Sequence, residues 1–222
     1  FVFGRPRAMF EDIDMLDAVI YTWHSGSQTG NAAANIVFGD VCPSGKLSVT
    51  LPKCTGQVPI FYNMHPVARC KQSYYEKQAN GTYKDIDGMP LYPFGYGLSY
   101  TEFEYSDIKV KKDKISLSDI EKGEGFEISV TVKNVGSFDG KETVQLYVRD
   151  CVSSMTRPVK ELKDFAKIFL KQNEEKTVTF KVGYDKLGFF RRDSKFAVEQ
   201  GKFKIFVGKD CYTESFVEVE VI

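Results

Sequence analysis

Hydrophobic and polar residues alternate along most of the second half of the chain. A period of two is typical of β-strands that bury one face and expose the other. Residues that favour turns, mainly glycine, asparagine and aspartate, separate the alternating stretches. The stretches are residues 103–110, 126–133, 143–148, 165–170, 176–182, 202–207 and 215–221.

About seven short strands in succession predict a β-sandwich of the immunoglobulin or fibronectin type III kind over residues 102–222. The Cys…Trp…Cys spacing of antibody domains is missing, and this favours the fibronectin type III-like form.

The beginning of the chain follows a different pattern. An apolar run at 17–23 predicts a parallel strand buried on both faces, and residues 1–3 predict the end of another strand. Residues 31–38 are rich in alanine and predict a helix that ends at Gly39, followed by a strand at 46–51. This order is a βαβ unit, which cannot bury both faces of its sheet alone. We therefore expect a mainly β chain whose sandwich is preceded by a partial α/β segment.

Between these two regions, residues 65–101 show little periodicity but are rich in proline and tyrosine. Disordered linkers are poor in aromatic residues, so we expect this connector to be ordered by lying against other structure. Proline and glycine disfavour both helix and regular strand in its last part, residues 91–101, which read Leu-Tyr-Pro-Phe-Gly-Tyr-Gly-Leu-Ser-Tyr-Thr. The predicted division is an α/β remnant at 1–64, the connector at 65–101 and the sandwich at 102–222.

Charge narrows the classes of function. Lys+Arg and Asp+Glu both number 30, so the net charge of zero gives no electrostatic basis for binding nucleic acid or an anionic membrane. No apolar run approaches the roughly 20 residues of a membrane-spanning helix. The first residue is Phe1 rather than methionine, so we expect a fragment whose leader, if it had one, is not visible.

Cysteine usage bears on the compartment. The chain has 5 cysteines, an odd number, and no Cys-x-x-Cys spacing. This favours free thiols in a reducing compartment, and so a cytoplasmic location, with one or two disulfides as the alternative. Neither the cysteines nor His65 show the spacing of metal ligands, so we expect no metal and no cofactor.

One loop is a candidate for binding. A turn of small residues at 24–30 follows the carboxyl end of a predicted parallel strand and precedes the predicted helix. Ligands bind open α/β sheets at this edge. Trp23, His24 and Gln28 are therefore the candidate substrate-proximal residues.

A purely structural interpretation of the same loop stays open. In it, Gly26 and Gly30 only form the turn, and Asn31 caps the helix. For any single residue we favour this interpretation, because the motif is too loose to assign contacts.

Four motifs, in this order, resemble family 3 glycoside hydrolases, the family of β-glucosidases and β-xylosidases. Residues 23–32 read Trp-His-Ser-Gly-Ser-Gln-Thr-Gly-Asn-Ala, similar to the family's Trp-Tyr-Pro-Gly-Gln-Glu-Gly-Gly-Asn-Ala. Residues 38–47 read Phe-Gly-Asp-Val-Cys-Pro-Ser-Gly-Lys-Leu, similar to its Phe-Gly-Asp-x-x-Pro-Ser-Gly-Lys-Leu. The third motif is 91–101, and the fourth lies in the sandwich, with Asn-Val-Gly at 134–136 and Val-Gln-Leu-Tyr-Val at 144–148. The resemblance covers nearly the whole chain. If the loop at 24–30 borders the sugar site, the departures at His24-Ser25 and Gln28 would change sugar specificity.

The resemblance implies the C-terminal portion of an exo-acting retaining β-glycosidase, with β-glucosidase favoured and β-linked glycosides as substrates. In that family the nucleophile is an aspartate of a β/α barrel, and the acid/base is a glutamate on a segment expected before Phe1. Glu11, the only glutamate before position 76, is interpreted as part of a solvated face. We therefore expect no catalytic residue in this chain. It would be structural and inactive alone, with the barrel and the missing α/β segments of the same enzyme as its partners.

The alternative is a non-catalytic carbohydrate-binding or protein-interaction β-sandwich module. Such a module has no use for an orphan βαβ unit, so the first 52 residues discriminate between the two. Exposed aromatic residues lined up on the sandwich would favour the module.

Overall fold

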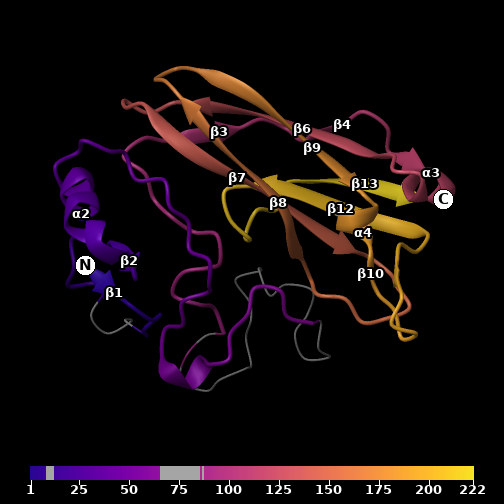
Figure 1. The fold of residues 1–222 in the computed structure, drawn as a ribbon, viewed down its shortest axis with the longest axis horizontal. Helices are drawn as coiled ribbons and strands as arrows, with labels where there is room; N and C mark the ends of the chain where they lie inside the picture. Colours follow the sequence, from indigo (N-terminus) through magenta and orange to yellow (C-terminus); the bar gives the residue numbers. More distant parts are fainter. Residues whose placement is uncertain (9–12, 66–85, 87) are drawn as a thin grey trace.

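The computed structural model describes residues 1–8, 13–65, 86 and 88–222. Two regions lie at opposite ends of the molecule, with a long connecting segment between them (Figure 1). The N-terminus belongs to a small α/β segment, and the C-terminus lies at the far end of a β-sandwich.

The sandwich is built from a five-stranded and a four-stranded sheet. The five-stranded sheet contains, in spatial order, β5 (Lys114–Ile115), β13 (Phe216–Val221), β12 (Gly201–Gly208), β7 (Gly140–Asp150) and β8 (Glu161–Leu170). The four-stranded sheet contains β6 (Gly125–Asn134), β9 (Glu175–Gly183), β3 (Phe103–Tyr105) and β4 (Lys109–Val110). In it, β6 pairs with β9 and with both β3 and β4. All pairs are antiparallel except β5 with β13.

Short elements complete the sandwich. Its small helices are α3 (Leu117–Glu121) and α4 (Tyr184–Leu187), and a two-stranded hairpin is formed by β10 (Phe189–Phe190) and β11 (Phe196–Ala197). Helix α3 begins where the Ser116 hydroxyl accepts the backbone N–H of Asp119 at 3.2 Å, as serine N-caps commonly do.

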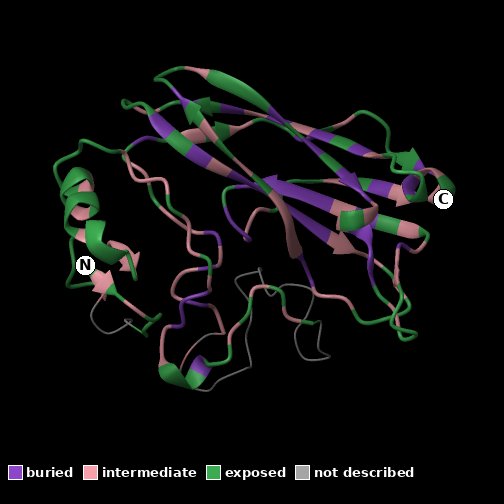
Figure 2. Ribbon diagram, in the orientation of Figure 1, coloured by how far each residue is buried: buried purple, intermediate pink, exposed green. Residues whose placement is uncertain are grey.

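The hydrophobic core lies between the two sheets (Figure 2). Alternate residues of the strands point into it and are buried, while their neighbours face water, as the period of two requires. The largest fully buried core side chains are Phe126, Phe203, Ile120, Ile128, Leu146, Leu170, Leu187 and Ile205.

The predicted sandwich is confirmed, and each alternating stretch carries strand structure. The stretch at 103–110 is divided into β3 and β4. Here the Ser106 hydroxyl, rather than a backbone carbonyl, accepts the N–H of Thr131 at 2.9 Å, so a side chain interrupts the ladder between β3 and β4.

The α/β segment contains less strand structure than predicted. It contains β1 (Val2–Phe3) paired in parallel with β2 (Tyr21–Trp23), then the 3₁₀ turn η1 (Gly26–Gln28) and helix α2 (Thr29–Val37). The strand expected at 17–23 therefore occupies only its last three residues.

The strand predicted at 46–51 is wrong. Leu47 donates to Tyr96 O at 2.8 Å, and Gly95 donates back to Leu47 O at 2.7 Å. Leu51 forms a single antiparallel bridge with Tyr92. Residues 46–51 thus bond through their backbone to residues 91–96 of the connector and not to β2. The expected βαβ unit is not completed in this part of the chain.

The end of the connector packs on the sandwich. Phe94 stacks on Tyr62 with ring centroids 4.1 Å apart, and both join a second buried cluster that contains Tyr147 of β7. Gly95 is required there, because an added Cβ would lie 2.3 Å from Gln145 Oε1 and its φ is +82°. Another short turn, η2 (Thr55–Gln57), lies earlier in the chain. The middle of the predicted connector, residues 66–85 and 87, lies outside the described residues.

Candidate functional site

The loop between β2 and α2 has an unusual backbone. Trp23 adopts φ +53°, a left-handed conformation that a bulky residue seldom takes, and Gly26 adopts φ +72°. The Ser25 hydroxyl donates to the carbonyl of Thr22, and the Thr29 hydroxyl donates to the carbonyl of Gly26 at 2.6 Å. These bonds close the turn at both ends and hold the left-handed Trp23 in place. Strained conformations of this kind are frequent at functional sites.

The loop lies at the carboxyl edge of the parallel pair, where the sequence places it. Gly4 follows β1 and donates its N–H to Trp23 O at 3.1 Å. The His24 ring lies beside Gly4, since a Cβ added to Gly4 would be 3.5 Å from His24 Cε1. The ring of Trp23 contacts that of Tyr21, with centroids 5.0 Å apart. Both strand ends therefore converge on His24.

Gln28 has a different environment. Its Oε1 accepts a hydrogen bond from Asn31 Nδ2 at 2.6 Å. Asn31 lies inside α2, which begins at Thr29, so the expectation that Asn31 caps the helix is wrong. Gly30 also lies inside the helix, so of the two glycines only Gly26 serves the turn through a positive φ.

The three candidates are open to solvent to different degrees. His24 and Gln28 are exposed, and Trp23 is half-buried. Among the residues that the structure describes, no hydrogen bond joins these three side chains to one another. The loop can therefore present an imidazole, an amide and an indole to a ligand, but it is not an assembled catalytic group.

The described part of the chain contains neither a candidate metal site nor a candidate membrane-spanning helix. There, no group of three or more histidine, cysteine, aspartate or glutamate side chains could hold a metal ion. No helix in that part is long and apolar enough to cross a bilayer. Cys42, Cys54, Cys151 and Cys211 are free thiols, and Cys70 and Glu11 lie outside the described residues.

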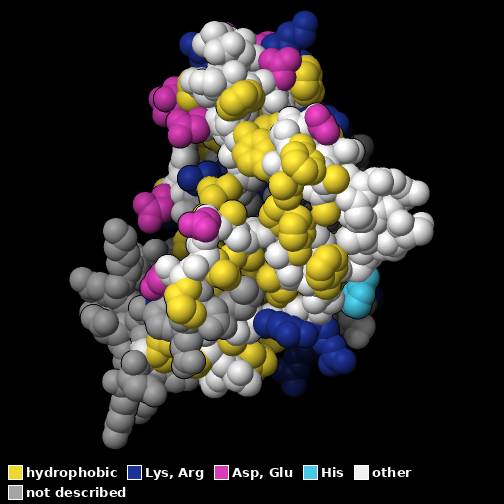
Figure 3. All heavy atoms as spheres, turned by 90° about the vertical axis from the view of Figure 1, so that its left-hand side faces the viewer, with side chains coloured by type: hydrophobic (Ala, Val, Ile, Leu, Met, Phe, Trp, Pro, Cys, Tyr) yellow, Lys and Arg dark blue, Asp and Glu magenta, His cyan; other side chains and the backbone are white. Residues whose placement is uncertain are grey.

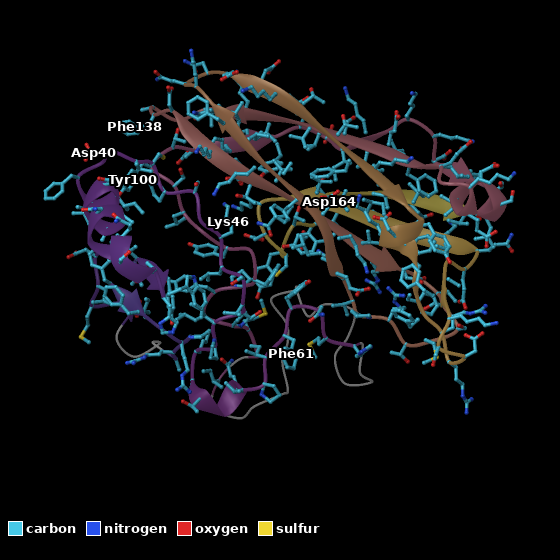
Figure 4. The ribbon with its side chains drawn as sticks, in the orientation of Figure 1. Asp40, Lys46, Phe61, Tyr100, Phe138 and Asp164 are labelled. Carbon is cyan, nitrogen blue, oxygen red and sulfur yellow. The ribbon has the colours of Figure 1, made fainter. Side chains whose placement is uncertain are left out.

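A second polar cluster, absent from the sequence-based prediction, joins the α/β segment to the sandwich. Lys46 Nζ lies 3.3 Å from Glu142 Oε2 and donates to Gly97 O at 3.0 Å. Glu142 belongs to β7 and is only 3% exposed. Figure 4 shows Lys46 between the connecting segment and the sandwich.

Tyr105 of β3 completes this cluster by donating its hydroxyl to Glu142 Oε1 at 2.8 Å. Burial and the adjacent Glu142 carboxylate raise the pKa of Tyr105, so the hydroxyl keeps its proton and remains a donor. The cluster thus fixes two regions relative to each other and is a structural joint. Its only sequence signal is Lys46 in the Pro-Ser-Gly-Lys-Leu motif, which we assigned to a strand.

Two family models match the chain. The model of the glycosyl hydrolase family 3 C-terminal domain matches residues 1–100, and the model of the fibronectin type III-like domain matches residues 142–211. The two matches follow one another in the order of the two regions seen in the structure.

Individual relatives agree with these matches. A periplasmic β-glucosidase of Salmonella typhimurium is 40% identical over 207 residues, which cover 93% of this chain and 26% of that protein. A β-xylosidase of Formosa agariphila is 40% identical over 98% of this chain and 28% of its own length. The crystal structure of a β-glucosidase from Listeria innocua in complex with glucose superposes with a TM-score of 0.88 at 36% identity, covering 99% of this chain and 30% of that one. The chain therefore spans less than a third of each of these relatives.

Proposed function

Because the chain belongs to family 3 of the glycosyl hydrolases and matches its C-terminal part, we propose that it forms the C-terminal portion of an exo-acting retaining β-glycosidase. The favoured activity is that of a β-glucosidase, which removes terminal non-reducing sugars from β-linked glycosides. The observation that carries this proposal is the likeness of the whole chain, α/β segment included, to a β-glucosidase whose structure contains glucose. A free-standing binding module would have no use for the α/β segment.

The α/β segment has an exposed apolar surface, which supports the proposal that other segments of the enzyme pack on it. No residue of α2 is buried, and Phe38 after it is 81% exposed. Hydrophobic side chains gather on the face at this end of the molecule (Figure 3). Exposed apolar patches of this kind mark surfaces that another element covers. We assign this surface to the remaining α/β segments of the same enzyme.

In this proposal the chain borders the sugar site without performing the chemistry. A retaining glycosidase needs two carboxyl groups about 5–5.5 Å apart. We propose that both lie in parts of the enzyme other than this chain, in line with the family resemblance. Trp23, His24 and Gln28 would form part of the wall around the sugar, with His24 and Gln28 as hydrogen-bonding groups and Trp23 as an apolar surface.

Activity measurements test the assignment. The 222-residue chain alone should not hydrolyse an aryl β-glucoside, whereas the chain co-expressed with the barrel and α/β segments should. Turnover that co-purifies with the chain alone would overturn the structural role. A reconstituted enzyme with no activity on any aryl β-glycoside would overturn the proposed activity.

A pair of variants in the reconstituted enzyme tests the loop. His24→Ala should raise KM about tenfold if the ring donates to a sugar hydroxyl, because a lost hydrogen bond of about 1.4 kcal/mol is a factor of ten. Ser27→Ala, in the same exposed turn, is the matched control and should leave KM unchanged. Equal KM values for the two variants would remove His24 from the sugar site.

The free cysteines are the basis for a proposal about the cellular compartment of the protein. We expect a reducing environment such as the cytoplasm, because the chain has 5 cysteines, an odd number, and the four that the structure describes are free thiols. Titration of the unfolded, unreduced protein should find all 5 thiols. A disulfide detected by mass spectrometry would argue for an oxidising compartment.

A further inference from the structure

A pocket lies where the connector meets the sandwich, away from the loop that follows β2. Its volume is about 770 Å³, within the range of about 300–1,000 Å³ that small-molecule sites occupy. The connector forms one wall, β3 forms another, and the segment after β12 forms the third.

Aromatic rings line part of this pocket. Tyr92 and Tyr96 of the connector stack with centroids 5.0 Å apart and an interplanar angle of 15°. Both are half-buried and both line the pocket, as do Phe103 and Tyr105 of β3. Stacked tyrosines present an apolar surface together with polar hydroxyl groups.

A buried carboxylate lies among these rings. Asp210 lines the pocket and is only 5% exposed. Its Oδ1 accepts the backbone N–H of Tyr212 at 2.8 Å, and it forms no ion pair with any described residue. Burial, the neighbouring Tyr92 and the Asp210 carboxylate raise the pKa of Tyr96, so its hydroxyl keeps its proton and can donate to a ligand.

We propose that this pocket binds a saccharide unit at a second, non-catalytic site, with Tyr92 and Tyr96 as the aromatic wall and Asp210 as the hydrogen-bond acceptor. The site belongs to the connector and the sandwich, and it goes beyond the proposed function because no step of hydrolysis requires it. It would let the sandwich hold a second part of a glycan, or a second glycan chain.

The residues that line the pocket favour a neutral polyol as the ligand over an anion or a quaternary ammonium ion. A sugar ring offers C–H groups that pack on an aromatic surface and hydroxyl groups that bond to a carboxylate and a tyrosine. An anion such as phosphate would meet two carboxylates, those of Asp210 and the exposed Asp107, against one cation, Lys209. A quaternary ammonium ion would suit the tyrosines and would be attracted by the two carboxylates, but it has no hydrogen-bond donor to offer Asp210.

Binding to the 222-residue chain is the test. Methyl β-D-glucopyranoside and cellobiose are titrated well into the millimolar range while amide chemical shifts are followed by NMR. We expect saturable shifts around residues 92–96 and 208–213. Asp210→Asn should weaken binding about tenfold, because an amide can keep the bond from Tyr212 N–H but loses the charge-assisted bond to the sugar. Tyr96→Phe, which keeps the stacked ring, should weaken it severalfold.

Matched controls separate binding from folding. Asp40→Asn and Tyr100→Phe change the same residue types outside the pocket and should leave the sugar affinity unchanged. Each variant must first give a dispersed spectrum like that of the parent chain. Sugar shifts that persist equally in Asp210→Asn would place the ligand elsewhere and overturn the proposal.

Two further probes test the ligand class. Saturation by tetramethylammonium or inorganic phosphate in place of sugar would overturn the saccharide assignment, as would the lack of any sugar-induced shift. The outcome is independent of the proposed enzyme activity. The binding assay uses the chain without the barrel, and a failed hydrolysis assay leaves it unaffected.

Discussion

The α/β segment and the sandwich contain similar residues but differ in what surrounds them. Both have apolar side chains at the spacing their elements require. In the sandwich, residues of both sheets face one another and form a continuous buried core. In the α/β segment, no residue of β1, β2 or α2 is buried. Local pattern can thus specify an element such as α2, whereas stability requires a partner that buries its apolar face.

Polar contacts, rather than apolar packing, connect the two regions. Glu142 is a residue of the sandwich, and Lys46 comes from the segment before the connector, yet their pair is well enclosed. The Tyr100 hydroxyl also donates to Ile36 O at 2.8 Å, which ties the connector to α2. The α/β segment is therefore held to the sandwich through polar contacts at its edge, while its own apolar face stays uncovered.

Hydrogen exchange should show the largest difference between the regions. Amides of β6, β7 and β12 should exchange only through global unfolding, whose cost of about 5–15 kcal/mol slows exchange by at least about 10³-fold. Amides of β1, β2 and α2 should exchange through local opening at a small cost. Equal protection of both regions in a proven monomer would contradict the comparison. Added barrel and α/β segments should raise protection in α2.

A pair of phenylalanine substitutions should separate the regions next. Phe126→Ala removes a fully buried ring of β6 and should lower the free energy of unfolding by about 3–5 kcal/mol. Phe38→Ala removes a ring that is exposed in this chain and should change it by no more than about 0.5 kcal/mol. Urea denaturation followed by tyrosine fluorescence measures both. A large effect of Phe38→Ala would mean that the ring is covered in solution.

The sandwich could be predicted from the sequence because its signal is local. Alternation fixes which residues of each strand face the core, and the turn residues mark the ends of the strands. The helix near residues 31–38 was predicted for the same reason, since it depends on alanine content and a following glycine.

The segment at 46–51 shows where this reasoning fails. Its apolar pattern is that of a strand, but its backbone bonds to residues 91–96, about 45 positions later in the chain. The spacing of apolar residues in the sequence cannot predict a pairing between segments so far apart. Gly97 is required because an added Cβ would lie 2.3 Å from Gly45 O, and that contact is visible only in three dimensions. The candidate loop was placed correctly at the strand edge, but its role in binding a sugar stays a prediction.

Removing Lys46 should weaken the joint between the regions. Lys46→Ala leaves the Glu142 carboxylate buried with Tyr105 as its remaining partner, and we expect a loss of about 3 kcal/mol in the free energy of unfolding. Lys111→Ala is the matched control, because Lys111 pairs with Glu127 on the surface and its loss should cost less than about 1 kcal/mol. Comparable losses for the two lysines would show that Glu142 is hydrated and the joint open.

The smallest expected effect is a pH dependence of the free energy of unfolding, caused by Asp150 at the end of β7. Burial raises the pKa of Asp150 to about 6, although Arg157 nearby opposes the shift. Asp150 Oδ2 makes no hydrogen bond within the described part of the chain. Since the unfolded pKa is lower, near 3.8, the folded state holds its proton more tightly between pH 4 and pH 6. The free energy of unfolding should therefore fall as pH rises through this window and stay lowered above it.

Asp150→Asn removes this penalty while keeping an acceptor for its backbone neighbours. The variant should be more stable than the parent at pH 8 by about 1 kcal/mol, a value reduced for solvent screening of a partly exposed group, and the advantage should vanish near pH 4. Asp40→Asn, at an exposed aspartate of the α/β segment, is the control for the change of residue type. Urea midpoints measured at both pH values decide between these outcomes. If Asp150→Asn were instead less stable at pH 8, the attraction of Arg157 would outweigh the cost of burial, and the carboxylate would stabilise this end of the sandwich.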